Sequence, residues 1–191
     1  LIPCRAETWG GWVFINMDMN AAPLLEFMGD LPAHFAPWQP ENRYVEAHVG
    51  KIMNCNWKLC QEAFMEAFHV ITTHPQILAG TGDENSAYDV WGNVSRAITP
   101  NATPSPHLRR QPAEQELLEA VMMRHIDDPA GPQVPDGMRA RSMLAAGARA
   151  NLQAIIGTDR EISDAELSDS IYYTLFPNFH PWGGYNRIVY R

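Results

Sequence analysis

The sequence has few cysteines, few positive charges and no long apolar run. Its three cysteines cannot make an even disulfide framework, and they lack the paired CxxC spacing of a zinc or cluster site. Only 14 lysines and arginines stand against 22 acidic residues, a net charge of −8, which argues against a nucleic-acid or anionic-membrane partner. No run of about 18 apolar residues is present to span a bilayer. We expect a protein of the reducing cytoplasm.

The two ends of the sequence also lack familiar features. The chain has no initiator methionine, and no basic segment followed by an apolar core indicates a signal peptide. It starts at Leu1 and stops at Arg191, within the strand-like string IVYR. We therefore expect a fragment that is truncated at both ends.

An apolar content of 46% predicts a single globular domain with a real core. Aromatic and β-branched runs or alternation predict strands, the first of them buried, at residues 9–16, 44–54, 87–99, 171–176 and 185–191. Helix-forming composition predicts helices at residues 24–28, 57–68, 112–125, 138–156 and 164–168. Strands at both ends with helices between them favour an α+β fold, an antiparallel sheet with helices packed over it.

The stretch NWKLCQEAFMEAFHVITTHP places two histidines and two acids in a largely apolar setting. On one helix, Glu62, Glu66 and His69 would share a face, because they are spaced i, i+4 and i+7. His74 lies five residues past His69, about 140° around a regular helix. The two imidazoles therefore converge only if the helix distorts or ends between them. The β-branched run 70–73 and the proline that follows His74 favour such a break.

Spacing alone leaves two interpretations of His69 and His74 open. One is ordinary polar satisfaction or an interaction with a helix terminus. The other is a mononuclear iron centre, since two imidazoles and one carboxylate on one face of a metal leave open positions for oxygen and substrate. Glu66 would then hydrogen-bond the free nitrogen of His69, whereas on the first interpretation it is a solvated helix acid. Its mostly apolar neighbours favour a partnered carboxylate.

This stretch resembles the iron-binding segment of the Rieske-type ring-hydroxylating oxygenases, the large (alpha) subunit in particular. The residues that match as they stand are Asn56, Trp57, Lys58, Glu62, Phe64, Glu66, His69, His74 and Pro75. Residues 8–24 are similar to the end of the family's Rieske domain, and residues 175–191 to a strand pair of its catalytic domain. Ala63 and Phe68 depart from the pattern, since the family often has Asn and Tyr there.

The resemblance implies a role for each matching residue of the site. His69 and His74 would be ligands of Fe(II) in a 2-His-1-carboxylate centre. Glu66 would be the bridging acid that links this iron to the Rieske cluster of a neighbouring subunit. Phe64 and Val70 would line the substrate pocket.

The resemblance also implies a domain organisation. Residues 1–22 would be the end of the Rieske domain and its connection, and residues 23–191 part of a helix-grip, START-like catalytic domain. The family's third iron ligand, an Asp, would follow Arg191. The Cys and His pairs that hold the [2Fe-2S] Rieske cluster would precede Leu1. The fragment is therefore expected to be inactive alone.

The implied activity is insertion of oxygen from dioxygen into an aromatic or related apolar substrate, as in the dioxygenases of aromatic hydrocarbon catabolism. A reductase or ferredoxin would supply electrons, and the subunits would form a homotrimer or a hetero-hexamer. Two rivals remain from the residues themselves. One is a metal-free helix-grip module that binds an apolar ligand. The other is a zinc-dependent hydrolase, which the absence of HExxH makes a poor match.

Overall fold

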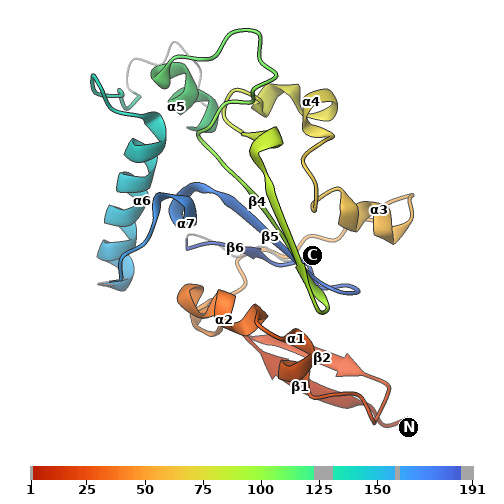
Figure 1. Ribbon diagram of the computed structural model, residues 1–191. Coiled ribbons are helices and arrows are strands. Elements are labelled where there is room, and N and C mark those ends of the chain that lie inside the picture. Colours follow the sequence, from red (N-terminus) through yellow and green to blue (C-terminus); the bar gives the residue numbers. More distant parts are fainter. Residues whose placement is uncertain (1, 123–130, 158–159, 186–191) are drawn as a thin grey trace.

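The computed structural model describes residues 2–122, 131–157 and 160–185, and its elements follow a mixed order (Figure 1). The strands are β1 (Arg5–Trp9), β2 (Trp12–Asn16), β3 (Ala87–Trp91), β4 (Val94–Thr99), β5 (Ser170–Leu175) and β6 (Trp182–Gly183). The α-helices are α1 (Leu24–Met28), α2 (Leu31–Phe35), α3 (Trp57–Glu62), α4 (Val70–Thr73), α5 (Glu114–Met122), α6 (Ala140–Ile156) and α7 (Asp164–Ser168). Single turns of 3-10 helix are η1 (Ala36–Trp38), η2 (Pro40–Asn42), η3 (Pro75–Ile77) and η4 (Asp83–Asn85). The predicted α+β class is confirmed.

The first sheet is the hairpin β1–β2, and the predicted buried strand 9–16 covers the end of β1, the turn and β2. Gly10 and Gly11 lie between the two strands with positive φ values of 58° and 92°, a backbone conformation that glycine adopts without steric cost. Val13 is 70% exposed and Ile15 is 71% exposed. The prediction of burial was therefore wrong for one face of the hairpin, because successive side chains of a strand point to opposite sides.

The second sheet is antiparallel with the strand order β3-β4-β5-β6. The predicted strand 87–99 is confirmed but turns back on itself at Gly92, whose φ is 51°. The predicted strand 171–176 is confirmed, shifted by one residue, as β5 at residues 170–175, which pairs with β4 over its whole length. β4 and β5 thus lie side by side in the sheet, although the helices α5, α6 and α7 lie between them along the chain.

Cross-strand register assigns side chains to the two faces of this sheet. Tyr88, Ala97, Tyr172 and Trp182 are successive partners on the four strands, so they form a row on one face. Asp89, Arg96 and Tyr173 are the next set of cross-strand partners on β3, β4 and β5. Each is adjacent in sequence to a residue of the first row, so this second row faces the opposite side of the sheet.

The main core lies on the face that carries Tyr173, between the sheet and the helices α1 and α2. Its buried residues are Leu24, Met28, Leu31, Phe35, Trp38, Val94, Leu152, Ile162, Ile171, Tyr173, Leu175, Phe179 and Tyr185. Trp9, Trp12 and Phe14 of the hairpin pack against this core. Arg96 donates to Asp89 through Nε at 2.9 Å, so the charged pair next to Tyr173 is mutually neutralised.

Helices α5, α6 and α7 form the connection between β4 and β5, and their predicted positions are confirmed. Residues 123–125 of the predicted helix 112–125 lie outside the described residues. An ion pair fastens α6 to the start of β5: Arg141 Nη2 lies 3.1 Å from Oδ2 of Asp169, whose side chain is 6% exposed. Arg141 also donates to the Asn101 carbonyl at 2.6 Å, just beyond β4. One side chain therefore holds both ends of the connection.

The predicted strand 44–54 is wrong. These residues are exposed and lie outside both sheets, with Tyr44 85%, Val49 87% and Ile52 91% exposed. Imperfect alternation supplies apolar side chains here, but a strand also needs a neighbour to take its backbone hydrogen bonds. No strand of the described residues pairs with this segment.

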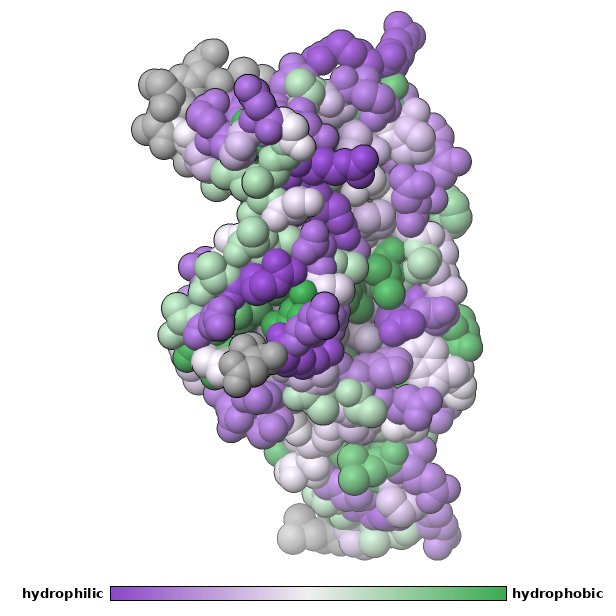
Figure 2. Space-filling view, turned by 60° about the vertical axis from the view of Figure 1, so that its left-hand side comes forward, coloured by the Kyte–Doolittle hydropathy of each residue, from purple (hydrophilic) through white to green (hydrophobic). Residues whose placement is uncertain are grey.

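Two further findings concern the surface and the last predicted strand. Within the described ranges, no helix is both long enough and apolar enough to cross a membrane. Figure 2 shows hydrophobic patches scattered among hydrophilic residues on the face it presents. The predicted strand 185–191 begins at Tyr185, which lies in a bend, and residues 186–191 lie outside the described residues.

Candidate metal centre

The helix expected over residues 57–68 ends at Glu62. Its N-terminus is capped, because the side chain of Asn56 accepts a hydrogen bond from the backbone N–H of Lys58 at 2.9 Å. After Glu62 the chain turns, so Glu62, Glu66 and His69 do not share one helix and the expected common face is wrong. The β-branched run at Val70–Thr73, expected to break the helix, instead forms the single turn α4.

Glu66 explains where the new turn starts. Its Oε2 accepts hydrogen bonds from the backbone N–H groups of Phe68 and His69, the latter at 3.2 Å. A carboxylate that takes up these amides satisfies donors at the beginning of α4, where helical residues have no backbone partner. Hydrogen bonds from the backbone to the Glu66 side chain thus favour a new helical turn, α4, over continuation of α3.

The two histidines flank this turn. His69 is the residue before α4 and His74 the residue after it, and the φ of −127° at His74 takes the chain out of the helix. Their ring centroids lie 5.3 Å apart with an interplanar angle of 74°. Two imidazoles that bind one metal through nitrogens roughly 2.1 Å away, at ligand angles near 90–110°, place their centroids about 5 Å apart. The spacing therefore fits a shared metal ion.

Glu66 also contacts the ring of His69. Its Oε1 lies 2.5 Å from Nδ1 of His69, and the two side chains are 28% and 30% exposed. With Nδ1 donating its proton to the carboxylate, Nε2 is left as the lone-pair nitrogen of the neutral ring. This arrangement fixes both the tautomer and the orientation that a metal-binding imidazole needs.

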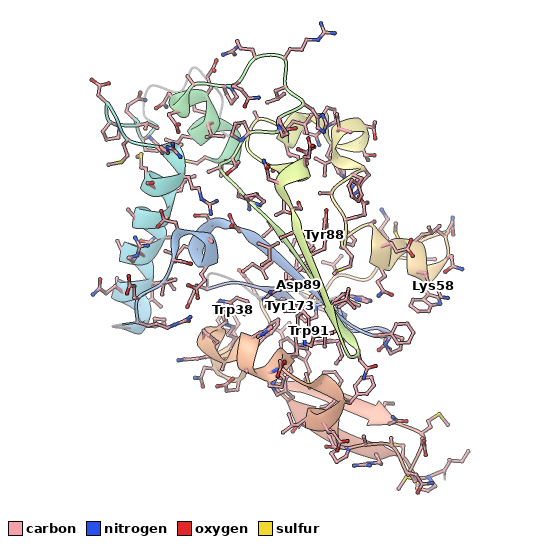
Figure 3. All side chains as sticks on the ribbon, viewed as in Figure 1. Trp38, Lys58, Tyr88, Asp89, Trp91 and Tyr173 are labelled. Atoms are coloured by element: carbon pink, nitrogen blue, oxygen red, sulfur yellow. The ribbon has the colours of Figure 1, made fainter. Side chains whose placement is uncertain are left out.

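The face of the sheet next to this segment carries three aromatic side chains, Tyr88, Tyr172 and Trp182, which we call the aromatic row. The Tyr88 hydroxyl accepts a hydrogen bond from the Ala67 N–H at 3.1 Å. Phe64 packs on Trp182 with centroids 5.8 Å apart, and Trp182 meets Tyr172 edge-on at 4.5 Å. Figure 3 shows Tyr88 on the α4 side of the sheet and Trp38 and Trp91 toward α2.

This row could not be predicted from sequence alone. Tyr172 and Tyr173 are adjacent and identical in type, so alternation could not tell which one faces the segment of Glu66 and His69. The signal that assigns them is the register with β4, which puts Tyr172 opposite Ala97.

The two predicted pocket residues have different surroundings. Phe64 touches the aromatic row through Trp182. Val70 is 7% exposed and packs with Ala67 and Leu78 in a small separate cluster. Its role in substrate binding stays a prediction.

A cavity of about 190 Å³ lies elsewhere, between the hairpin and the turn after β5. Its lining includes Phe14, Leu24 and Phe176. Glu66, His69 and His74 do not line it. Over the described ranges, no group of three or more His, Cys, Asp or Glu side chains is arranged to hold a metal. The assignment of His69 and His74 as metal ligands therefore stays a prediction, with Glu66 in contact with the ring of His69.

Comparison with known proteins gives a family match over most of the chain. Residues 33–180 match the model of the ring hydroxylating alpha subunit (catalytic domain). The chain is also 31% identical, over 78 residues, to the glycine betaine monooxygenase oxygenase subunit of Pseudomonas aeruginosa. It is 32% identical, over 77 residues, to the carnitine monooxygenase oxygenase subunit of Escherichia coli.

These relatives are much longer than the stretch they share with this chain. The alignment covers 41% of this chain and 18% of the glycine betaine monooxygenase subunit. For the carnitine monooxygenase subunit the shares are 39% and 21%. The chain thus matches about a fifth of each relative.

Proposed function

Since the chain belongs to the family of ring-hydroxylating oxygenase alpha subunits, we propose that it is part of a Rieske-type oxygenase whose Fe(II) is held by His69 and His74. The observation that carries the proposal is the 5.3 Å separation of the two imidazole rings. The backing of His69 Nδ1 by Glu66 supports it, since metal-binding imidazoles usually have such a partner.

The remaining parts of the centre would come from outside the described residues. We propose that the third ligand is an Asp, as in this family, and that a [2Fe-2S] Rieske cluster supplies the electrons to the iron. We also propose that residues 1–22 are the end of a Rieske domain and residues 23–191 part of a helix-grip catalytic domain. Glu66 would link the iron to the cluster of a neighbouring subunit, which requires a trimer or a hetero-hexamer. A reductase or ferredoxin would supply the electrons.

The residues of this chain have definite tasks in such a centre. When bound, the iron supplies the activation of dioxygen that no side chain can provide. Glu66 holds the proton on His69 Nδ1, so that Nε2 stays available as a ligand. Phe64 packs on Trp182, and Trp182 meets Tyr172 edge-on, so these rings offer an apolar surface beside this segment.

We infer that the substrate is a small quaternary ammonium compound rather than an aromatic ring. The two relatives named above are monooxygenases of glycine betaine and carnitine, judging from their names. The aromatic row offers what such a cation needs, because a methylated ammonium is attracted to the faces of Trp, Tyr and Phe. An aromatic substrate remains the second candidate, since the same rings could stack on it.

The substrate test uses the full-length protein with a reductase, NADH and dioxygen. Oxidation of one N-methyl group by one oxygen atom, with the second oxygen reduced to water by two electrons and two protons, yields a hydroxymethyl group that leaves as formaldehyde. We expect glycine betaine to give formaldehyde, and carnitine to give a tertiary amine and an aldehyde from whichever N-bound carbon is hydroxylated. The control is 3,3-dimethylbutanoate, which has the shape of glycine betaine without the positive charge, and it should bind at least tenfold more weakly. Turnover of benzoate but of neither ammonium compound would reverse the assignment.

Metal analysis separates the proposed centre from its two rivals. The full-length protein, reconstituted with Fe(II) without oxygen, should bind one iron in addition to the iron of its Rieske cluster. His69→Ala and His74→Ala should each lose that iron and keep the cluster absorbance. A preference for zinc would favour the hydrolase, and no metal beyond that of the cluster would favour the metal-free binding module. An iron content that both substitutions leave unchanged would overturn the assignment of His69 and His74 as ligands.

A further inference from the structure

Two cysteines meet at the beginning of α3. Cys55 is exposed and Cys60 is half-buried, and their Sγ atoms lie 3.1 Å apart. Cys4 is exposed in the segment that precedes β1. The contact between Cys55 and Cys60 plays no part in the proposed metal centre.

The cap of the helix brings the two thiols together. Asn56 is the N-cap of α3, so Cys55 occupies the position before the cap and Cys60 the fourth helical position. Side chains at these two positions face each other in many helices, where an apolar pair often fixes the path of the chain into the helix. Here both positions carry a thiol. The hydrogen bond from Lys58 N–H to the Asn56 side chain holds this geometry in place.

The helix between the two thiols has little else to hold it. None of the residues of α3 is buried. Trp57 is 48% exposed and makes a tilted ring contact with Phe176 at 6.1 Å. A covalent link across the first turn would therefore change the local stability of α3 substantially, because few other contacts there resist opening.

We propose that Cys55 and Cys60 are a redox-responsive dithiol that hydrogen peroxide converts into an intramolecular disulfide clamping the first turn of α3. One sulfur attacks the peroxide, breaks its O–O bond and becomes a sulfenic acid, with release of water. The second sulfur then attacks the sulfenic acid, forms the S–S bond and expels a second water. Two thiols and one peroxide thus give one disulfide and two waters, and two protein thiols are oxidised by two electrons.

The contact also affects the acidity of one thiol. The hydrogen bond with Cys60 raises the pKa of the Cys55 thiol, and its partial desolvation raises it further. Either sulfur can start the reaction, because the 3.1 Å contact places each within reach of the other.

The clamp lies on the path to the metal-binding segment. From the end of α3 at Glu62, a short turn carrying Phe64 leads to Glu66 and His69. Lys58 lies inside the loop that the disulfide would close, which makes it a convenient reporter. Trypsin must unfold the first turn of α3 to cut after Lys58.

The test treats the reduced full-length protein with hydrogen peroxide and maps its peptides by mass spectrometry. The peptide that spans Cys55 and Cys60 should lose about 2 Da and regain it with dithiothreitol. Mapping reads this pair separately from every other cysteine of the full-length protein. Cleavage after Lys58 should slow by roughly tenfold in the oxidised form.

Matched variants make the proposal refutable. In Cys55→Ser and in Cys60→Ser the remaining thiol has no partner to close the disulfide, so its sulfenic acid should accumulate and be trapped by dimedone. Cys4→Ser should behave as the parent protein. The proposal is overturned if Cys55 and Cys60 oxidise independently to sulfinic acids. It is also overturned if they cross-link to other cysteines, or if Lys58 is cut equally fast in both states.

Discussion

The Tyr88 hydroxyl accepts a hydrogen bond from the backbone N–H of Ala67, at 3.1 Å, and so ties β3 to the turn that carries Glu66 and His69. Ala67 is 6% exposed, so its amide has little access to water. The bond joins the sheet to the segment of Glu66 and His69 at the point where the chain enters α4.

Tyr88→Phe removes this acceptor and leaves the Ala67 amide without it. We expect a loss of about 1–3 kcal/mol in the free energy of unfolding, the usual cost of a buried unsatisfied donor. Urea denaturation of the full-length protein measures it. Tyr44→Phe is the control, because Tyr44 is 85% exposed and its substitution should change stability by less than about 0.5 kcal/mol. Equal effects of the two substitutions would contradict the structural role of the Tyr88 hydroxyl.

Two glycines have opposite expected responses to alanine. A Cβ at Gly183 on β6 would lie 2.0 Å from ring carbons of Trp38, whereas a Cβ at Gly147 in α6 meets nothing within 4 Å. Gly183→Ala should therefore lower the free energy of unfolding by about 1–3 kcal/mol, the usual cost of overpacking. Gly147→Ala should stabilise it by about 0.5–1 kcal/mol, the gain from replacing glycine within a helix. Thermal unfolding of both variants checks the contrast in sign.

His34 predicts a pH dependence of stability. Burial lowers its pKa below the ordinary value of 6.5, and the nearby Arg96 lowers it further, against smaller opposing effects of Asp30 and Asp89. The folded state therefore binds this proton less readily than the unfolded state. The resulting stability is fully present above pH 6.5 and is lost as the pH falls through the lowered folded value.

The test compares urea unfolding of the parent protein and His34→Gln at pH 7.5 and pH 5.5. The variant should lose less stability than the parent over this interval, because it cannot take up the proton. Its absolute stability at pH 7.5 is not the readout. An identical loss in both proteins would show that His34 does not contribute to the pH dependence.

Glu66→Gln tests how the carboxylate supports the proposed iron site. The amide can still accept one backbone hydrogen bond, but it cannot hold the His69 proton as a charged acceptor does. We expect the affinity for Fe(II) to fall by roughly tenfold or more, as when other partners of metal-bound histidines are removed. Anaerobic titration with Fe(II) measures it. Glu62→Gln, at the end of α3, should bind iron as the parent does.

Much of the fold could be predicted from local pattern, and the exceptions have physical causes. Helix α6 and strand β5 follow directly from composition and alternation. The helix over residues 57–68 was overestimated because Glu66 binds backbone amides and starts a new turn, which no propensity scale includes. The strand at residues 44–54 was wrong because pairing depends on a partner strand as well as on sequence.

The candidate site was predictable only in its polar part. The family-like motif identified His69, His74 and Glu66, and the structure brings these three side chains into one group. The aromatic part comes from strands far along the chain, at Tyr88 and Tyr172, and its facing depends on the register through Ala97. Register is a property of the assembled sheet, and one residue of slip would exchange the faces.

The long connection between β4 and β5 has a consequence for how such proteins diverge. β4 ends at Thr99 and β5 begins at Ser170, and the two strands are neighbours, with Arg141 holding both ends of the connection through Asp169 and the Asn101 carbonyl. Once the ends are fixed, doubling the length of a flexible loop costs only about 0.6 kcal/mol. Insertions and deletions can therefore accumulate in the loops of this connection without moving the paired strands. The helices themselves are more constrained, because Leu152 of α6 belongs to the main core against the sheet.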